Sequence, residues 1–440
     1  MKELNRATWR GFCARVSILG AIGVSAGLAS GCHDDNSGNT GDNGTATNVV
    51  YVLSNSPTAG QNSVLAYRRA GDGSLSAMSG SPFLTGGTGT ANPTQALGPD
   101  DIDTPIAVSA DHHRMFAVNP GSNTIAVMTI SSSGALTPVP GSPFASGGIN
   151  PASVAVSGDK LFVLNKSNDP AQITSQLPNY TAFTIASTGA LTPIVGSTVN
   201  TIAGASPQLV LLSPSKTLLF GADFMAPGTP SHQGALRSFT VSPAGALAPA
   251  PGTPLDIPGP VEPMTHVVLG LAVHPTQNVL YAGFVAQDKL GVYTYDGTGA
   301  LTFKTSVANT GKAICWIISN ATGSVLYTTN TADNSISRYN NSNPLAPVES
   351  QHLVLQEGGV TYTDPMGHVV PTSEDYQLML DPTGKNLYVL SQHTNPDFTV
   401  ANGNILHTLT VAGDGTLSET VATTHLPVSA QTRPWGVVVF

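Results

Sequence analysis

The chain has 440 residues, of which only 10% are charged, and it contains 46 Gly and 33 Pro. Hydrophobic residues make up 40% of the sequence, enough to fill a core, which excludes wholesale disorder and a collagen-like chain. The formal net charge of −9 argues against nucleic acid as a partner, because nucleic-acid-binding proteins present basic surfaces.

Residues 1–31 have the pattern of an export signal. Basic residues precede an apolar, small-residue run from Val16 to Ala29, which is shorter than the ~20 residues that a membrane-spanning helix needs. The run ends in Leu28-Ala-Ser-Gly-Cys32, which resembles the bacterial lipobox, and this resemblance implies lipidation of Cys32. Ordinary signal-peptidase cleavage is the alternative. Both interpretations predict an exported protein, and the first predicts a lipid-anchored one in the periplasm or at the outer membrane.

Residues 32–48 follow as a predicted flexible tether. After Cys32 they are rich in Asp, Asn, Gly, Ser and Thr and contain no large apolar side chain, so they cannot bury enough surface to fold. Beyond this segment Cys315 is the only cysteine, which excludes an internal disulfide. Because Cys315 lies within an apolar run, a buried, inert thiol is favoured over a nucleophile.

Residues 49–440 consist of repeated units. A Gly-x-Leu step marks six of them, and Asn343-Pro-Leu345 is a weaker seventh copy; the six steps begin at Gly73, Gly134, Gly189, Gly245, Gly299 and Gly415. Each unit carries four short β-type runs bounded by turn residues, and no sustained helical period follows the signal. In the third unit the predicted strands are Pro151–Val156, Leu161–Asn165, Tyr180–Ile185 and Ala190–Val195.

The two ends of the repeat region predict how the units close into one domain. The first unit begins at its second strand, Val49–Leu53, while the chain finishes with a strand of the missing first type at Arg433–Phe440. We therefore predict an all-β, seven-bladed β-propeller in which the C-terminal strand pairs into the first blade. A string of separate domains would not need such a split unit.

The repeat also resembles a known family. Ser109-Ala-Asp, Met115-Phe-Ala-Val-Asn119 and Gly134-Ala-Leu-Thr137 are similar to the blade repeat of lactonase-type propellers, as is Asp381–Val389. That family includes 6-phosphogluconolactonase and the carboxymuconate-cyclising enzymes. The resemblance implies the fold and an activity on lactones, a carboxylic ester hydrolysis, although these motifs are structural and fold does not imply function.

Link lengths distinguish the two faces of the predicted ring. The links between first and second strands, and between third and fourth, are short throughout and emerge on one face. Every long link lies on the opposite face, which we call the long-loop face; these links are Leu84–Thr104, Lys166–Asn179, Phe224–Gln233, Leu255–Val267, Glu357–Glu374 and Gln392–Gly403. Because binding residues favour variable loops on a rigid scaffold, we expect the long-loop face to be the working one. Insertions accumulating on an unselected solvent surface are the alternative.

Charged residues at the starts of innermost strands are the candidate site. The set is Asp101, Asp103, His266, Lys312, Glu374, Asp375 and Arg433. Lactone hydrolysis needs a base or an attacking carboxylate and a group that stabilises the oxyanion. His266, Glu374 or Asp375 are candidates for the base, and Arg433 or Lys312 for the oxyanion partner. The resemblance implies His, Glu and Arg at this position, and ordinary solvated loop charges are the alternative for each.

Ligand and partner expectations follow from composition. No cofactor is required, although Asp101 and Asp103 could hold a divalent cation through oxygen ligands despite lacking the spacing of a calcium loop. Few arginines are available to hold phosphate, so an unphosphorylated sugar lactone or sugar acid is the favoured ligand. A non-catalytic propeller that binds a ligand or an envelope protein remains the alternative function. We expect a monomer that contacts the membrane only through its lipid anchor.

Overall fold

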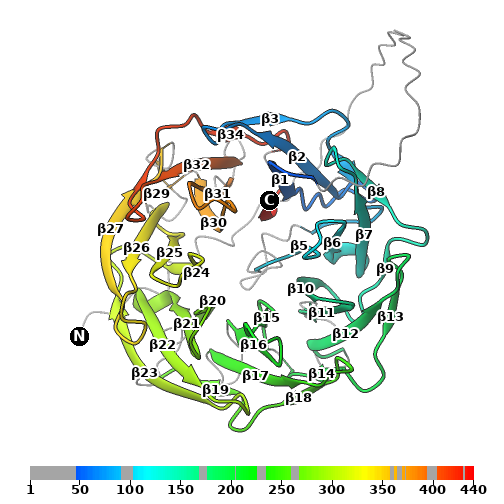
Figure 1. The fold of residues 1–440 in the computed structure, drawn as a ribbon, viewed down its shortest axis with the longest axis horizontal. Coiled ribbons are helices and arrows are strands. Elements are labelled where there is room, and N and C mark those ends of the chain that lie inside the picture. The colour runs from blue at the N-terminus through cyan, green and yellow to red at the C-terminus, as the bar shows by residue number, and fades with distance from the viewer. Residues whose placement is uncertain are drawn as a thin grey trace.

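Seven β-sheets are arranged radially around a central axis, and the chain passes from one to the next in sequence order (Figure 1). The structure is a computed structural model that describes residues 46–90, 103–167, 176–203, 205–224, 234–258, 267–356, 361–363, 369–371, 373–393, 404–429 and 432–440. The predicted signal, Cys32 and all but the last few residues of the tether lie outside the described residues. The all-β, seven-bladed propeller predicted from the repeats is confirmed.

Blades 1 to 4 each have four main strands, and a short additional strand pairs with the third. Blade 1 contains β1 (Val49–Leu53), β2 (Ser63–Arg69), β3 (Leu75–Ala77) and β4 (Phe83–Leu84). Blade 2 contains β5 (Ile106–Val108), β6 (Arg114–Asn119), β7 (Thr124–Ile130), β8 (Leu136–Pro138) and β9 (Phe144–Ala145). Blade 3 contains β10 (Pro151–Ser157), β11 (Lys160–Asn165), β12 (Asn179–Ile185), β13 (Leu191–Pro193) and β14 (Val199–Asn200). Blade 4 contains β15 (Leu211–Leu212), β16 (Leu218–Asp223), β17 (Ala235–Val241), β18 (Leu247–Pro249) and β19 (Leu255–Asp256).

Blades 5 and 6 have long, continuous outer strands instead. Blade 5 contains β20 (Val268–Val273), β21 (Val279–Phe284), β22 (Lys289–Tyr295) and β23 (Leu301–Ala308). Blade 6 contains β24 (Ile314–Ser319), β25 (Val325–Asn330), β26 (Ser335–Asn340) and β27 (Val348–Val354). Blade 7 contains β30 (Ser373–Leu380), β31 (Asn386–His393), β32 (Ile405–Val411), β33 (Leu417–Ser418) and β34 (Thr424–His425). A hairpin, β28 (Thr361–Thr363) with β29 (Val369–Pro371), interrupts the link from blade 6 to blade 7 and was not foreseen.

The C-terminal strand closes the ring as predicted. β35 (Trp435–Val439) is the innermost strand of blade 1 and pairs antiparallel with β1, with Val50 opposite Val439 and Leu53 opposite Trp435. Phe440 extends the ladder, since its main chain exchanges hydrogen bonds with Val49 at 2.9 and 3.1 Å. The two ends of the repeat region therefore share one sheet.

The recurring glycine links neighbouring blades. At Gly73, Gly134 and Gly415 the backbone has a φ of 88°, 79° and 89°, a conformation that side chains disfavour. The carbonyl of each accepts a hydrogen bond from a buried tyrosine of the preceding blade: Tyr388 binds Gly73 at 2.8 Å, Tyr51 binds Gly134 at 2.6 Å and Tyr327 binds Gly415 at 2.8 Å. The Gly-x-Leu repeat is thus an inter-blade contact as well as a turn.

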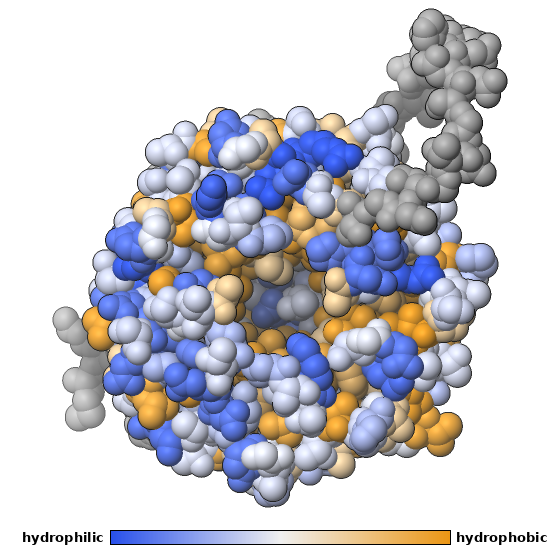
Figure 2. Space-filling model, viewed as in Figure 1, coloured by the Kyte–Doolittle hydropathy of each residue, from blue (hydrophilic) through white to orange (hydrophobic). Residues whose placement is uncertain are grey.

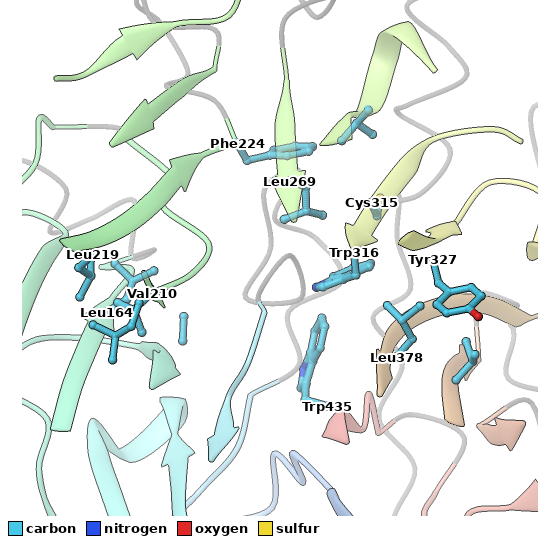
Figure 3. Close-up of a cluster of buried hydrophobic side chains, with 14 of the residues drawn as sticks. Leu164, Val210, Leu219, Phe224, Leu269, Cys315, Trp316, Tyr327, Leu378 and Trp435 are labelled. Carbon is cyan, nitrogen blue, oxygen red and sulfur yellow. The ribbon is translucent and has the colours of Figure 1, made fainter. Parts of the chain in front are cut away.

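Apolar side chains from the inner strands form the core around the axis. One buried cluster extends from Leu164, Val210 and Leu219 through Leu269 to Leu378 (Figure 3). The face drawn in Figure 2 is hollowed at the centre of the ring. Cys315 is a buried thiol in the same cluster, as its apolar surroundings in sequence predicted. In the described part of the chain, no helix is long and apolar enough to cross a membrane.

Candidate functional site

Arginines on the short links identify the two faces of the ring. Arg114, at the start of β6, donates to the carbonyl of Ser187 in the link between the third and fourth strands of blade 3. Arg68 makes the same kind of contact with Ser133 of blade 2. Both kinds of short link therefore share one face, and the starts of the innermost strands lie on the other. That other face carries the candidate site residues.

Glu374 lies at the start of β30 and faces blade 1. It is fully buried and pairs in the ladder with Gln392, whose side-chain amide donates to the carbonyl of Pro434 at 2.9 Å. Because directly paired residues share one face of a sheet, Glu374 points toward the segment that begins β35. The Tyr376 hydroxyl lies 3.4 Å from Glu374 Oε2 and donates to it. Arg433 precedes Pro434 and is half-buried, and its guanidinium donates to the main-chain carbonyl of Thr432 at 3.4 Å. Glu374 and Arg433 thus come from the starts of adjacent inner strands.

The Tyr376 ring packs against two indoles. Trp316, Tyr376 and Trp435 come from the successive inner strands β24, β30 and β35, and the ring of Tyr376 lies 4.8 Å from Trp316 and 5.5 Å from Trp435. The two indoles are 6.5 Å apart although blade 7 separates their strands, so both project toward the axis (Figure 3). The indoles are fully buried and Tyr376 is half-buried. We call these residues the aromatic cluster.

Asp375 faces the opposite way, into the interface between blades 6 and 7. It pairs with Ser391, whose hydroxyl contacts the Asn334 side chain of blade 6 at 3.3 Å. The main-chain N–H of Asn330 donates to Asp375 Oδ2 at 3.3 Å. Burial, followed by the nearby Asp333 carboxylate, raises the pKa of Asp375 well above its ordinary value. The structure therefore separates Glu374 and Asp375, which sequence reasoning had treated as interchangeable bases.

Lys312 lies away from this interface. Its exposed ammonium forms an ion pair with Asp288 of blade 5 at 3.0 Å. Asp288 also accepts from the N–H of Ala313 at 2.7 Å, so the pair fixes the start of β24. Lys312 thus links blades 5 and 6.

The predicted metal ligands and the histidine are only partly within the described residues. Asp101 and His266 lie outside them. Burial of its carboxyl raises the pKa of Asp103 to about 7, although the residue as a whole is half-exposed, and Thr104 donates to it at 3.2 Å. Across the described ranges, no three His, Cys, Asp or Glu side chains gather as metal ligands.

Sequence reasoning missed two polar residues on the long-loop face. Lys166, just after β11, is fully buried and donates to Gln208 Oε1 at 3.3 Å. The main-chain carbonyl of Gln208 accepts from the N–H of Asp103 at 3.0 Å. The sequence held one signal for Lys166. The residue after the repeated strand-end asparagine is Pro120 in blade 2 and Thr331 in blade 6, whereas blade 3 has a lysine there.

The short-loop face also carries a depression. It has a volume of about 1520 Å³ and spans turns of blades 6, 7 and 1. Its walls include Ile318, Met379, Asp381, Lys385 and Asp414. Asp381 forms an ion pair with Arg69 of blade 1 at 2.8 Å, and Asp414 accepts from the main-chain N–H of Thr416. Both carboxylates are therefore occupied by contacts on this face.

Comparison with known proteins supports the fold. No protein-family model and no curated protein matches the chain. Among solved structures, a periplasmic gluconolactonase from Pseudomonas aeruginosa superposes with a TM-score of 0.61 at 17% identity, covering 88% of this chain and 99% of that one. A candidate 6-phosphogluconolactonase from Bacteroides fragilis gives 0.58 at 14% identity over 86% and 95% of the two chains. A protein from Lactobacillus plantarum gives 0.57 at 18% identity over 88% and 99%.

The chain has the seven-bladed propeller fold of these solved structures. At these identities the likeness concerns the fold, and the chemistry must be argued from the residues of this chain. The similar coverage of both partners shows that the ring, rather than one blade, is shared.

Proposed function

We propose that this lactonase-type propeller is exported and opens an unphosphorylated sugar or organic-acid lactone at the long-loop end of its channel. The observation that carries the proposal is Glu374, a buried carboxyl on an inner strand, beside the segment that bears Arg433 and within reach of the Tyr376 hydroxyl. A base and a cation on adjacent inner strands are the minimum that lactone hydrolysis requires.

The proposed reaction uses these groups in order. The Glu374 carboxylate takes a proton from water, and the resulting hydroxide attacks the lactone carbonyl carbon. Arg433 stabilises the negative charge that develops on the carbonyl oxygen. The bond between the acyl carbon and the ring oxygen then breaks, and the ring oxygen takes the proton from Glu374 to become a hydroxyl. The product is a hydroxy acid, and the half-buried ring of Tyr376 offers an apolar face to the substrate.

The distribution of cations favours a substrate without phosphate. Phosphate is usually held by several Arg or Lys side chains. Of the six arginines beyond the predicted signal, Arg68, Arg69, Arg114 and Arg338 contact short-link segments, and Arg237 is paired with Asp223 at 2.6 Å. The sixth, Arg433, lies at the start of an inner strand. The similar periplasmic gluconolactonase agrees in compartment with the predicted export signal.

A panel of sugar and organic-acid lactones, assayed by acid release, tests the proposal. Glu374→Gln and Arg433→Ala should each lower kcat/KM by about a hundred- to a thousand-fold, the usual cost of losing one oxyanion donor or the base. Lys385→Ala, an exposed turn residue on the short-loop face, is the matched control and should be silent. If no lactone opens faster with the protein than in buffer, the enzyme proposal fails and the binding-module alternative replaces it.

A further inference from the structure

The start of β30 is tied to blade 6 through Asp375. Asp375 is fully buried; its Oδ2 accepts from the N–H of Asn330 at 3.3 Å, and its main-chain carbonyl accepts from the Thr331 hydroxyl at 3.0 Å. In the described part of the chain, Oδ1 has no hydrogen-bond partner. A bulge begins here, because the ladder with β31 shifts between Asp375 and Leu378. The start of the strand that carries Glu374 therefore contacts blade 6 through the main chain of Asp375 and through one oxygen of its buried carboxyl.

The groups that face Asp375 oppose its ionisation. Asp333 of blade 6 lies nearby and accepts from Ser335 at 2.6 Å, and His352 lies behind it at 3.5 Å. Beyond Asp333 stand Asp288 and Lys312, whose charges are paired with each other. The Asp333 carboxyl therefore adds to the effect of burial in raising the pKa of Asp375.

On its own blade, Asp375 faces neutral and internally paired groups. Ser391 lies directly opposite in the ladder and contacts His407 Nε2 at 3.0 Å. His407 Nδ1 in turn lies 2.6 Å from Glu419 Oε1, so any charge on this imidazole is matched within blade 7. No lysine or arginine contacts Asp375 in the described ranges.

We propose that Asp375 is a positioning residue. As a neutral acid it holds the start of β30 against blade 6, a contact that we call the latch, and so keeps Glu374 in place. Loss of its proton weakens the latch. The inference rests on the proposed function for its consequence, because a displaced Glu374 would no longer act as the base. The latch itself is a property of the interface between blades 6 and 7. It can be measured without any substrate.

The sign of the pH dependence follows from the protonation states. In an opened interface the Asp375 carboxyl meets water and titrates near its ordinary value of about 3.9. In the closed interface it keeps its proton to higher pH. The latch therefore has its full strength below about pH 4. Above that pH, the equilibrium constant for opening the interface rises by up to tenfold for each pH unit, until the closed form also ionises.

Hydrogen–deuterium exchange of the full chain, corrected for intrinsic rates at each pH, tests the latch. Protection of peptides from β30 and from residues 325–334 should fall as pH rises from 4 to 8. Peptides from β6 and β7 of blade 2 should not share this fall, because the amide of Asn62 reaches Asn119 at 2.8 Å there without a titrating group. If the protection of β30 in the wild-type protein does not change between pH 4 and 8, the inference is overturned.

Two variants separate the latch from a merely structural role. Asp375→Asn, which cannot ionise, should fold and remove the pH step. Asp333→Asn removes the repelling charge, so the fall should level off at a lower pH and be smaller in total. If the protection of β30 falls with pH in Asp375→Asn as it does in the wild-type protein, the proposal is refuted. If Asp375→Asn does not fold, an unchanged fall in Asp333→Asn refutes it instead. If lactones are opened, kcat/KM of the wild-type protein should fall as pH rises, and this fall should vanish in Asp375→Asn. If no lactone is opened, the proposed function fails, while the exchange result still decides whether the latch exists.

Discussion

Removal of the closing strand is the strongest perturbation of this ring. Deleting residues 435–440 takes away β35 and exposes the inner edge of β1, whose five residues are buried on all sides. The lost side chains are Trp435, three valines and Phe440, all at most 9% exposed. At ~1.5–3 kcal/mol for each large apolar side chain, the loss is roughly 10 kcal/mol. Domains are stable by only ~5–15 kcal/mol, so we expect the truncated chain to misfold.

Thermal unfolding and size-exclusion chromatography measure this outcome. The truncated protein should lose its cooperative transition and aggregate, because an open β edge invites pairing between chains. Trp435→Ala keeps the strand but removes one side chain, and should cost about 3–5 kcal/mol while leaving a cooperative transition. A synthetic peptide of residues 433–440 should restore part of the stability. Unchanged melting and solubility after truncation would refute closure by this strand.

Three further predictions concern other parts of the chain. Arg237→Met leaves the Asp223 carboxylate buried without its cation and should cost about 3–5 kcal/mol in urea unfolding, most of which the added Asp223→Leu should recover; an unchanged midpoint in the single variant would contradict this. Gly270→Ala should lower Tm markedly, because φ is +62° and a Cβ would lie 2.1 Å from the Cys315 carbonyl, whereas Gly297→Ala in open space should not. Cys32→Ser should abolish lipid labelling and membrane retention, and a wild-type protein that is already unlabelled in its native host would count against the anchor.

The architecture could be predicted because its signals are local and repeated. In the third unit, the predicted strand Pro151–Val156 is observed as Pro151–Ser157, and Leu161–Asn165 as Lys160–Asn165. Turn residues and short β-type runs depend on neighbouring residues alone, and their repetition reveals the number of blades. The hairpin β28–β29 carries no copy of the repeat, so nothing in the sequence indicated it.

The site could be predicted only as far as its position on the ring. Glu374, Asp375 and Arg433 do lie at the starts of inner strands, as their places in the repeat indicated. Tyr376 was missed, because its contact with Glu374 and with two indoles depends on strands that are far apart in sequence.

What each of the two neighbouring acids does was decided by tertiary structure alone. Successive side chains of a strand point to opposite faces, so Glu374 and Asp375 must face different blades. Which blade each one meets depends on ring closure: the segment that leads into β35 supplies Pro434 on one side of β30, and the end of β25 supplies Asn330 on the other. The same carboxyl chemistry therefore becomes a candidate base on one face and, on the other, a buried contact whose pKa is raised by burial.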